Sequence, residues 1–383
     1  MEIIIMGSKT SCMGAIILLS MLFMPTFIHA LMAPEIRELR TKHRLSSLLV
    51  FGDSSVDPGN NNRITTTMKS NFLPYGMDFV GGRPTGRFCD GKLGTDFVAD
   101  AIGYASTIPG FLDPNITKED LLHAVSFASA GSGYDDLTSN LTQTISLSKQ
   151  VEYLKHYKIH LEQYVGHKKA NEILRKAVIL LSMGTNDYLQ NYFLEPTRPK
   201  QFTLDKYQDF LVSRMRLAIE EMHKVGAKRI GVVGVPPIGC MPIVMTFTGD
   251  GIHCVDKMNK AVLSLNSKIQ KQMEAIRTQL NMKTIFVDVY NIIESAINNP
   301  KKYGTMSLSK FLNILRRHGD GSFFVRGLKI INAHFHVIGS DVVVVIKDQL
   351  WTYGTIGNKD FLGAYVQDLV RLQRDVAGQD HLS

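Results

Sequence analysis

The sequence predicts an α/β fold: a doubly wound, mostly parallel sheet with helices on both faces. Two observations lead to this fold class. Several short, continuous apolar runs each end in a turn, as strands buried on both faces of a parallel sheet do. Amphipathic segments with helical spacing lie between these runs, and strand and helix alternate along the chain.

Four runs carry the strand pattern. They are "LLVFGDS" (48–54), "AVILLSMGTND" (177–187), "RIGVVGVPP" (229–237) and "KTIFVDVY" (283–290). Each is rich in Val, Ile, Leu or Phe and short enough for one strand. We expect all four to be buried on both faces of the sheet.

Two segments between the runs carry the helix pattern. The first has apolar residues spaced along 147–165, and the second repeats an apolar residue every three or four positions over six turns. The members of the second are Met258, Val262, Leu265, Ile269, Met273, Ile276 and Leu280. This spacing places one apolar stripe on each helix, facing the sheet.

The chain has 383 residues, of which 44% are hydrophobic and 20% are charged. This composition supports a large buried core and argues against disorder. Residues 1–30 differ from the rest, with Lys9, an apolar run from Met13 to Phe27 and a small residue at Ala30. They predict a cleaved secretory signal peptide. The alternative is a membrane anchor, but the run is short and is interrupted by Ser20 and Pro25.

Secretion changes the interpretation of the cysteines. Cys12 lies in the signal segment, and Cys240 and Cys254 flank a short glycine-containing loop, so we expect these two to pair in an oxidising compartment. Closing so short a loop contributes about 3 kcal/mol in the chain-entropy model. Cys89 is left over. Two glycosylation acceptor sequences, at Asn115 and Asn140, are consistent with export.

The net charge of +8 does not indicate a nucleic-acid partner. Lys and Arg are dispersed beside acidic residues, and no basic run is interleaved with aromatic residues. We expect a solvated basic surface, attracted to acidic polysaccharide or lipid. After signal cleavage no segment is long enough to span a bilayer, because "DVVVVI" (341–346) has only the length of a strand.

Glycine-bearing loops follow the predicted strands. In a doubly wound sheet, ligands bind at the carboxyl ends of the strands. The candidate loops are Gly52-Asp53-Ser54-Ser55, Gly131-Ser132-Gly133, Gly184-Thr185-Asn186-Asp187 and Pro236-Pro237-Ile238-Gly239. An acyl-transfer site needs a nucleophile on a tight turn and donors aimed at a developing oxyanion. Each loop alone also fits ordinary turn chemistry or a helix N-cap, whereas their ordered combination favours a site.

The chain resembles the plant branch of the GDSL esterase/lipase family, also called SGNH hydrolases. The resemblance covers residues 46–304, and its motifs are "FGDSSVDPGNNN", "PYGMDFVGGRPTGRFCDGK", "VSFASAGSGYDD", "MGTNDY", "GVPPIGCMP" and "VDVYNIIESAINNPKKYG". It implies a flavodoxin-like fold of the SGNH hydrolase type, a secreted hydrolase of acyl esters located in the cell wall or apoplast, and no cofactor or metal. Ser55 stands where the namesake motif has Leu.

The resemblance implies three catalytic positions: Ser54 as the nucleophile, with Gly131 and Asn186 as oxyanion donors beside the backbone N–H of Ser54. We expect Asp53 to stabilise the turn. The family also uses an Asp-x-x-His near the C-terminus as base and orienting carboxylate, and residues 305–383 contain no such motif. Two earlier segments also fit Asp-x-x-His, namely Asp120-Leu121-Leu122-His123 and Asp250-Gly251-Ile252-His253. The first precedes the motif with Gly131 and the second lies between Cys240 and Cys254, so we interpret both matches as coincidence.

Four histidines follow Gly304, namely His318, His334, His336 and His381, and none is assigned as base. His334 and His336 alternate as on a strand, but no further metal ligands accompany them. We treat 305–383 as a divergent segment, which either folds or arises from an altered reading of the gene's 3′ end. Two hypotheses follow: a secreted serine esterase/lipase acting through an acyl-enzyme, or a non-catalytic or weakly active member that keeps the fold.

Overall fold

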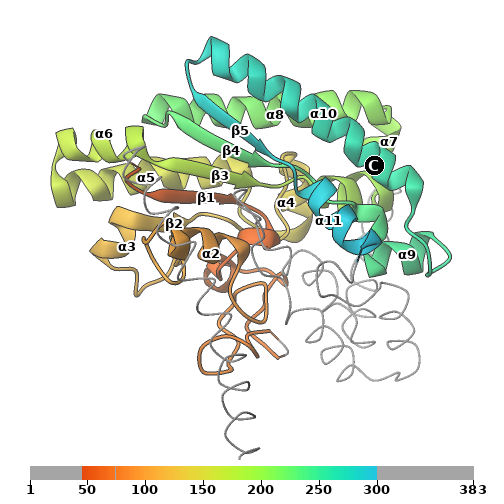
Figure 1. Ribbon diagram of the computed structural model, residues 1–383, viewed down its shortest axis with the longest axis horizontal. Helices are drawn as coiled ribbons and strands as arrows, with labels where there is room; N and C mark the ends of the chain where they lie inside the picture. The colour runs from red at the N-terminus through yellow and green to blue at the C-terminus, as the bar shows by residue number, and fades with distance from the viewer. Residues whose placement is uncertain (1–44, 74, 300–383) are drawn as a thin grey trace, which may run out of the picture.

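The computed structural model describes residues 45–73 and 75–299. Five parallel strands form one sheet in the order β2-β1-β3-β4-β5, and all of them point the same way in Figure 1. The strands are β1 (Leu48–Gly52), β2 (Ala124–Ser126), β3 (Val178–Ser182), β4 (Arg229–Val233) and β5 (Lys283–Val287). This is the strand order of flavodoxin-like folds, so the predicted fold class is confirmed.

Helices cover both faces of the sheet. Those in the described residues are α2 (Gly94–Ala101), α3 (Lys118–His123), α4 (Asp136–Thr142), α5 (Leu147–Val165), α6 (His167–Lys176), α7 (Thr197–Gln201), α8 (Leu204–Val225), α9 (Pro242–Thr248), α10 (Asp256–Gln279) and α11 (Val289–Asn298). A π-helix, η3, spans Asp187–Leu194, and short 3₁₀ turns span Ser54–Val56 (η1), Asn60–Arg63 (η2) and Ile238–Cys240 (η4).

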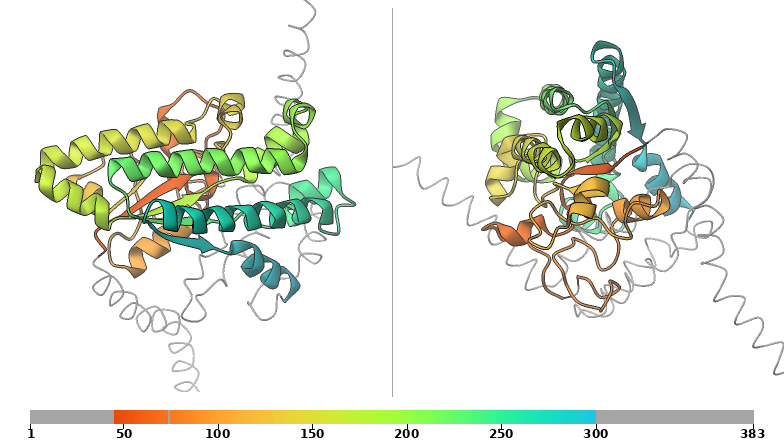
Figure 2. Two further views of the ribbon diagram at one scale, coloured as in Figure 1. Left: turned by 90° about the horizontal axis from the view of Figure 1, so that it is seen from above. Right: turned by 90° about the vertical axis from the view of Figure 1, so that its left-hand side faces the viewer.

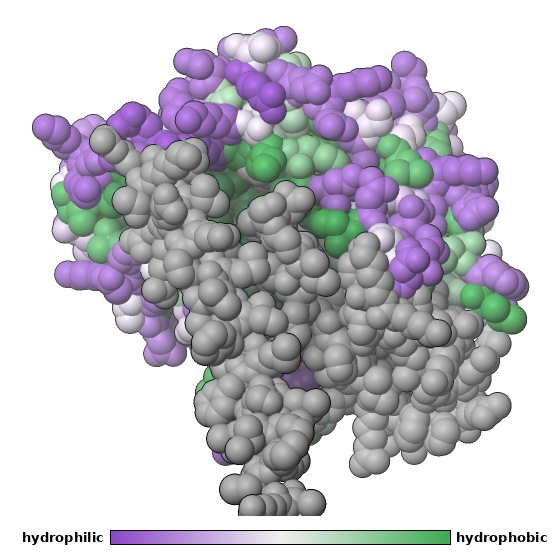
Figure 3. Space-filling view, viewed as in Figure 1, coloured by the Kyte–Doolittle hydropathy of each residue, from purple (hydrophilic) through white to green (hydrophobic). Residues whose placement is uncertain are grey.

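Alternating residues of β1 pack into two different hydrophobic cores, because successive side chains of a strand point to opposite faces of the sheet. Leu49 and Phe51 of β1 pack into the larger core with α5, α6, α8 and α10. Leu48 and Val50 pack into a smaller core with residues of α2. Figure 2 shows α5, α8 and α10 side by side on the face of the sheet that carries the larger core, and Figure 3 shows mostly hydrophilic residues at the top of the molecule, over α10.

The long helices follow from their caps and apolar stripes. Ser146 accepts a hydrogen bond from the Lys149 N–H at the start of α5, and Thr203 accepts one from the Lys206 N–H at the start of α8. Such caps satisfy N–H groups that have no partner within the helix. The predicted stripe of α10 is buried from Met258 to Ile276, as its spacing requires.

Two sequence expectations need correction. The run 283–290 was expected to be buried on both faces, but β5 lies at the edge of the sheet and Ile285 is 60% exposed. An apolar run therefore does not distinguish a central strand from an edge strand. The strand β2 was implied only by the loop at Gly131 and was not among the four predicted runs, because three residues are too few to show a pattern.

The predicted disulfide is present between Cys240 and Cys254. It joins the end of η4 to the loop before α10, and the segment that it closes contains α9. Cys89 is not part of a disulfide; it is buried, and its thiol donates to the Gly91 carbonyl oxygen at 2.8 Å. No helix among the described residues is long and apolar enough to cross a membrane.

Candidate active site

Ser54 lies directly beyond the end of β1, as predicted. The strand ends at Gly52, and Ser54 begins the turn η1, where it is 4% exposed. Asp53 precedes this turn, and its Oδ1 accepts the Ser55 N–H at 2.9 Å. The turn-stabilising role expected for Asp53 is thus confirmed. Its carboxyl is buried, and burial raises the pKa of Asp53 to about 6.

The end of β1 is the point at which the strand order reverses. The chain passes from β1 to β2 on one side and then crosses to β3 on the other. Loops that leave neighbouring strands on opposite sides of such a point border a crevice, where doubly wound proteins bind their ligands. The loops after β1, β2 and β3 are those that carry the three predicted residues.

The loop after β2 lies against the end of β1. The Ser132 hydroxyl and the Ser129 N–H both donate to the Gly52 carbonyl oxygen, at 2.9 and 3.0 Å. Gly131 lies between these serines with a φ of +84°, and a Cβ there would lie 2.9 Å from the Thr142 hydroxyl oxygen. Glycine is therefore required at this position for both the backbone conformation and the close approach.

Asn186 joins the same cluster from β3. Its Nδ2 donates to the Ser132 carbonyl oxygen at 2.9 Å, and the side chain is 2% exposed. The residue has helical dihedral angles and makes no side-chain N-cap hydrogen bond. The Asn186 side chain therefore does not cap the helix that follows this strand, and its amide points toward the loop that carries Gly131. The three predicted residues lie on three loops that hydrogen bonds hold together.

Donors in this cluster lack acceptors. Within the part of the chain that the structure describes, no acceptor takes the backbone N–H of Ser54 or of Gly131, and the Ser54 hydroxyl has no hydrogen-bond partner. Buried N–H groups are almost always paired. Unpaired donors at strand ends beside a serine hydroxyl are the arrangement expected of a site that receives an oxyanion.

Gln150 of α5 also supports the nucleophile turn, although nothing in the sequence indicated it. This side chain is fully buried, accepts the Gly52 N–H at 3.0 Å and donates to the Gly52 carbonyl oxygen at 2.9 Å. The pairing of β1 with β2 stops at Ser126, so the Gln150 amide takes the place of the next strand residue. It fixes the backbone two residues before Ser54.

The second half of the motif "FGDSSVDPGNNN" forms hydrogen bonds with the loop that carries Gly131. Asp57 accepts the Ala130 N–H at 2.9 Å, and the Asn61 amide donates to the Ala130 carbonyl oxygen at 3.0 Å. Both residues are buried, and burial raises the pKa of Asp57 to about 7. The motif therefore supplies both the nucleophile and the support of a donor loop.

Asp187 connects the loops after β2 and β3. Its carboxylate accepts the Tyr134 N–H at 2.8 Å, the Asp135 N–H at 3.1 Å and the Thr138 hydroxyl at 2.6 Å. A Cβ on Gly133 would lie 2.2 Å from Asp187 Oδ1, so the turn passes directly over this carboxylate. Burial raises the pKa of Asp187 to about 7.

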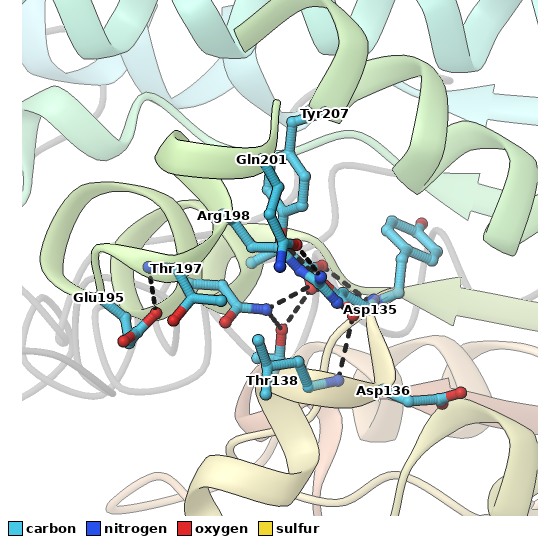
Figure 4. A network of polar contacts seen from close by, with 12 residues as sticks. Asp135, Asp136, Thr138, Glu195, Thr197, Arg198, Gln201 and Tyr207 are labelled. Atoms are coloured by element: carbon cyan, nitrogen blue, oxygen red, sulfur yellow. Dashed lines mark hydrogen bonds and ion pairs between the residues drawn. The ribbon is translucent and has the colours of Figure 1, made fainter. Parts of the chain in front are cut away.

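The Asp135 carboxylate connects the loop after β2 to residues of α7 and α8 (Figure 4). Asp135 accepts two hydrogen bonds from the Arg198 guanidinium, at 2.7 and 2.8 Å, and one from the Tyr207 hydroxyl at 3.2 Å. Asn191 of η3 donates to the same carboxylate at 3.0 Å. The helices that follow Gly131 and Asn186 are therefore tied to each other and to α8.

No catalytic base is identified among residues 45–73 and 75–299. No histidine among them forms a hydrogen bond with Ser54. Thr117 caps α3 by accepting the Asp120 N–H, and the Asp120 carboxylate accepts the Thr117 hydroxyl. His123 contacts Glu119 instead, so Asp120 and His123 are not paired with each other. Asp250 and His253 do contact each other at 2.6 Å, but the histidine side chain is 79% exposed.

The four histidines after Gly304 lie outside the described residues, as do the signal segment and residues 305–383. A cluster of metal-ligating side chains is absent from residues 45–73 and 75–299.

Comparison with known proteins identifies the family. The family model for "GDSL-like Lipase/Acylhydrolase" matches residues 48–350. Three GDSL esterase/lipases of Arabidopsis thaliana are 50%, 44% and 43% identical to the chain over 274, 278 and 263 residues. These alignments cover 72%, 71% and 68% of the chain, and 76%, 74% and 75% of the relatives. With this match, and with motif loops that meet at the carboxyl edge of a parallel sheet, the chain belongs to the plant GDSL esterase/lipase family and is by resemblance a carboxylic ester hydrolase.

Proposed function

We propose that the protein is a secreted serine esterase or lipase that cleaves acyl esters through a covalent acyl-enzyme on Ser54. The observation that carries this proposal is the cluster of unpaired donors at the strand ends: the backbone N–H groups of Ser54 and Gly131 lie on loops joined by hydrogen bonds to Gly52 and Ser132. A hydroxyl at such a position can attack a carbonyl carbon while its oxygen is received by prearranged donors.

We propose the following reaction. The Ser54 Oγ forms a bond to the acyl carbon, and the carbonyl oxygen becomes an oxyanion that accepts hydrogen bonds from the Ser54 N–H, the Gly131 N–H and Asn186 Nδ2. Collapse of this intermediate breaks the ester bond and releases the alcohol, which takes up a proton. Water then attacks the acyl-serine in the same way and releases the carboxylic acid.

A base must accept the Ser54 proton in the first step. The family match extends to residue 350 and thus includes His318, His334 and His336. We propose His334 and His336 as the candidates, because they alternate as on a strand. The family match favours a hydrolase over the non-catalytic alternative. Ser54 is the proposed nucleophile whichever of the two histidines is the base, so separate variants test the base and the nucleophile.

Secretion is supported by several independent features. The N-terminal segment has the pattern of a signal peptide, the disulfide Cys240–Cys254 suits an oxidising compartment, and Asn115 and Asn140 of the two glycosylation sequences are both exposed. We propose that the mature enzyme begins after Ala30, carries glycans at one or both asparagines and acts outside the cell.

Turnover of short acyl esters by the purified protein tests the proposal. Ser54→Ala should remove nearly all turnover, and Asn186→Ala should lower kcat by roughly 100-fold or more, as loss of one oxyanion donor does elsewhere. His334→Ala and His336→Ala, made singly, identify the base by a comparable loss. If Ser54→Ala keeps the turnover of the unaltered protein, Ser54 is not the nucleophile.

A further inference from the structure

The Asn186 amide can adopt only one orientation in its surroundings. The Ser132 carbonyl oxygen lies 2.9 Å from the Asn186 nitrogen, and a carbonyl oxygen can only accept a hydrogen bond. The reversed amide would bring two oxygens together at that distance, which electrostatic repulsion disfavours. Asn186 Oδ1 therefore has to lie on the other side of the amide, where it needs a donor.

Gln190 supplies that donor. Its Nε2 donates to Asn186 Oδ1 at 3.3 Å, and the side chain is 5% exposed. The hydrogen bond between these amides agrees with the one to Ser132, because the orientation that the Ser132 carbonyl oxygen requires turns Asn186 Oδ1 toward the nitrogen of Gln190. One amide thus has its oxygen fixed by Gln190 and its nitrogen fixed by the loop of Gly131.

Two features of Gln190 indicate a role beyond packing. Its Oε1 is buried and has no partner in the part of the chain that the structure describes, an unfavourable state that an apolar residue of similar size would avoid. Gln190 also lies in the π-helix η3, a rare conformation that is frequent at functional sites. The fold therefore keeps an imperfectly satisfied amide where the oxygen of Asn186 needs a donor.

We propose that Gln190 is a positioning residue that holds the Asn186 amide with its nitrogen toward the oxyanion. The proposal rests on the function proposed above, in which Asn186 is an oxyanion donor. Gln190 acts through Asn186 and touches neither the substrate nor Ser54. Its removal should therefore affect the transition state more than the binding of substrate, and only while Asn186 is present.

Kinetics of the full chain test this role. Gln190→Met keeps the length and removes the donor; we expect kcat to fall about tenfold or more while KM changes less than about twofold. Asn186→Ala should lower kcat by roughly 100-fold or more, and adding Gln190→Met to it should change kcat by less than about twofold. Gln163→Met, at an exposed position of α5, is the matched control and should behave as the unaltered protein.

A second readout does not depend on turnover. In protein labelled with ¹⁵N-asparagine, the side-chain amide signals of Asn186 are those lost in Asn186→Ala. Gln190→Met should shift these signals and speed the exchange of their protons, whereas Gln163→Met should leave them in place. Unchanged Asn186 signals in Gln190→Met would overturn the inference, including for a protein without measurable turnover.

The two readouts separate the possible failures. If Asn186→Ala leaves kcat unchanged, the donor assignment of the proposed function is wrong, and the amide signals still decide whether Gln190 holds the side chain. If Asn186→Ala is impaired but Gln190→Met is not, the positioning role is wrong. An equal loss from Gln190→Met in the presence and absence of Asn186 would also contradict it, because that result indicates general damage to η3.

Discussion

Replacing Gln150 by leucine should destabilise the fold at the end of β1, where Gln150 contacts Gly52. The substitution keeps an apolar side chain of similar size but removes every hydrogen bond that the amide makes. The Gly52 N–H loses its acceptor and the Ile145 carbonyl oxygen loses its donor, whereas the Gly52 carbonyl oxygen keeps the Ser129 N–H and the Ser132 hydroxyl. The change therefore leaves two buried backbone groups without partners.

Each such group costs about 1–3 kcal/mol, so the free energy of unfolding should fall by about 2–6 kcal/mol. Gln163→Leu is the matched control on the same helix, because Gln163 is exposed, and surface substitutions of this kind usually change stability by about 0.5 kcal/mol or less. Urea unfolding followed by circular dichroism measures both. Should Gln150→Leu unfold within about 1 kcal/mol of the control, the claim that Gln150 completes the end of β1 is wrong.

Three further predictions concern other parts of the site. Gly133→Ala should lower the free energy of unfolding by about 2 kcal/mol or more, because its Cβ would lie 2.2 Å from Asp187 Oδ1, whereas Gly91→Ala, with no neighbour closer than 3.8 Å, should not; equal thermal midpoints would contradict this. His253→Ala should leave turnover of short acyl esters unchanged, because the side chain is 79% exposed and forms no hydrogen bond with Ser54 among the described contacts; a large fall in kcat would make it a candidate for the base. Asp53→Asn keeps the acceptor for Ser55 but does not titrate. Burial raises the pKa of Asp53 in the folded protein from 3.8 to about 6, so the folded state favours the protonated carboxyl. The contribution of Asp53 to the free energy of unfolding is therefore complete below about pH 4 and is lost as the pH rises through about 6. Urea unfolding at about pH 4 and about pH 7 should therefore show a larger loss for the unaltered protein, by about 3 kcal/mol, and equal losses would show that Asp53 does not titrate in this range.

The sequence was informative where one residue type is required for a local reason. The position of Ser54 just after the end of β1, the turn held by Asp53 and the disulfide between Cys240 and Cys254 each follow from short-range patterns, and the structure contains all three. The placement of Gly131 and Asn186 beside one another was implied by the family resemblance. It depends on the strand order, which brings the loops after β2 and β3 to the two sides of β1.

The supporting contacts could not be predicted, because they join residues far apart in the chain. Gln150 contacts Gly52 from a helix whose pattern shows only that position 150 faces inward, and Arg198 reaches Asp135 across 63 residues. Nothing local distinguishes Gln190 from any other glutamine of a helix. The edge position of β5 likewise depends on how many strands the sheet has, which a single apolar run does not specify.

The central claim is that Ser54 becomes acylated, and covalent labelling tests it most directly. A fluorophosphonate that reacts with activated serines is added to the purified full chain, and the site of modification is mapped by mass spectrometry of peptides. The account predicts a single adduct on Ser54, with no labelling of Ser54→Ala and slower labelling of Asn186→Ala, because the phosphonyl oxygen uses the same donors as the oxyanion. An adduct on another serine, or equal labelling of Ser54→Ala, would contradict it.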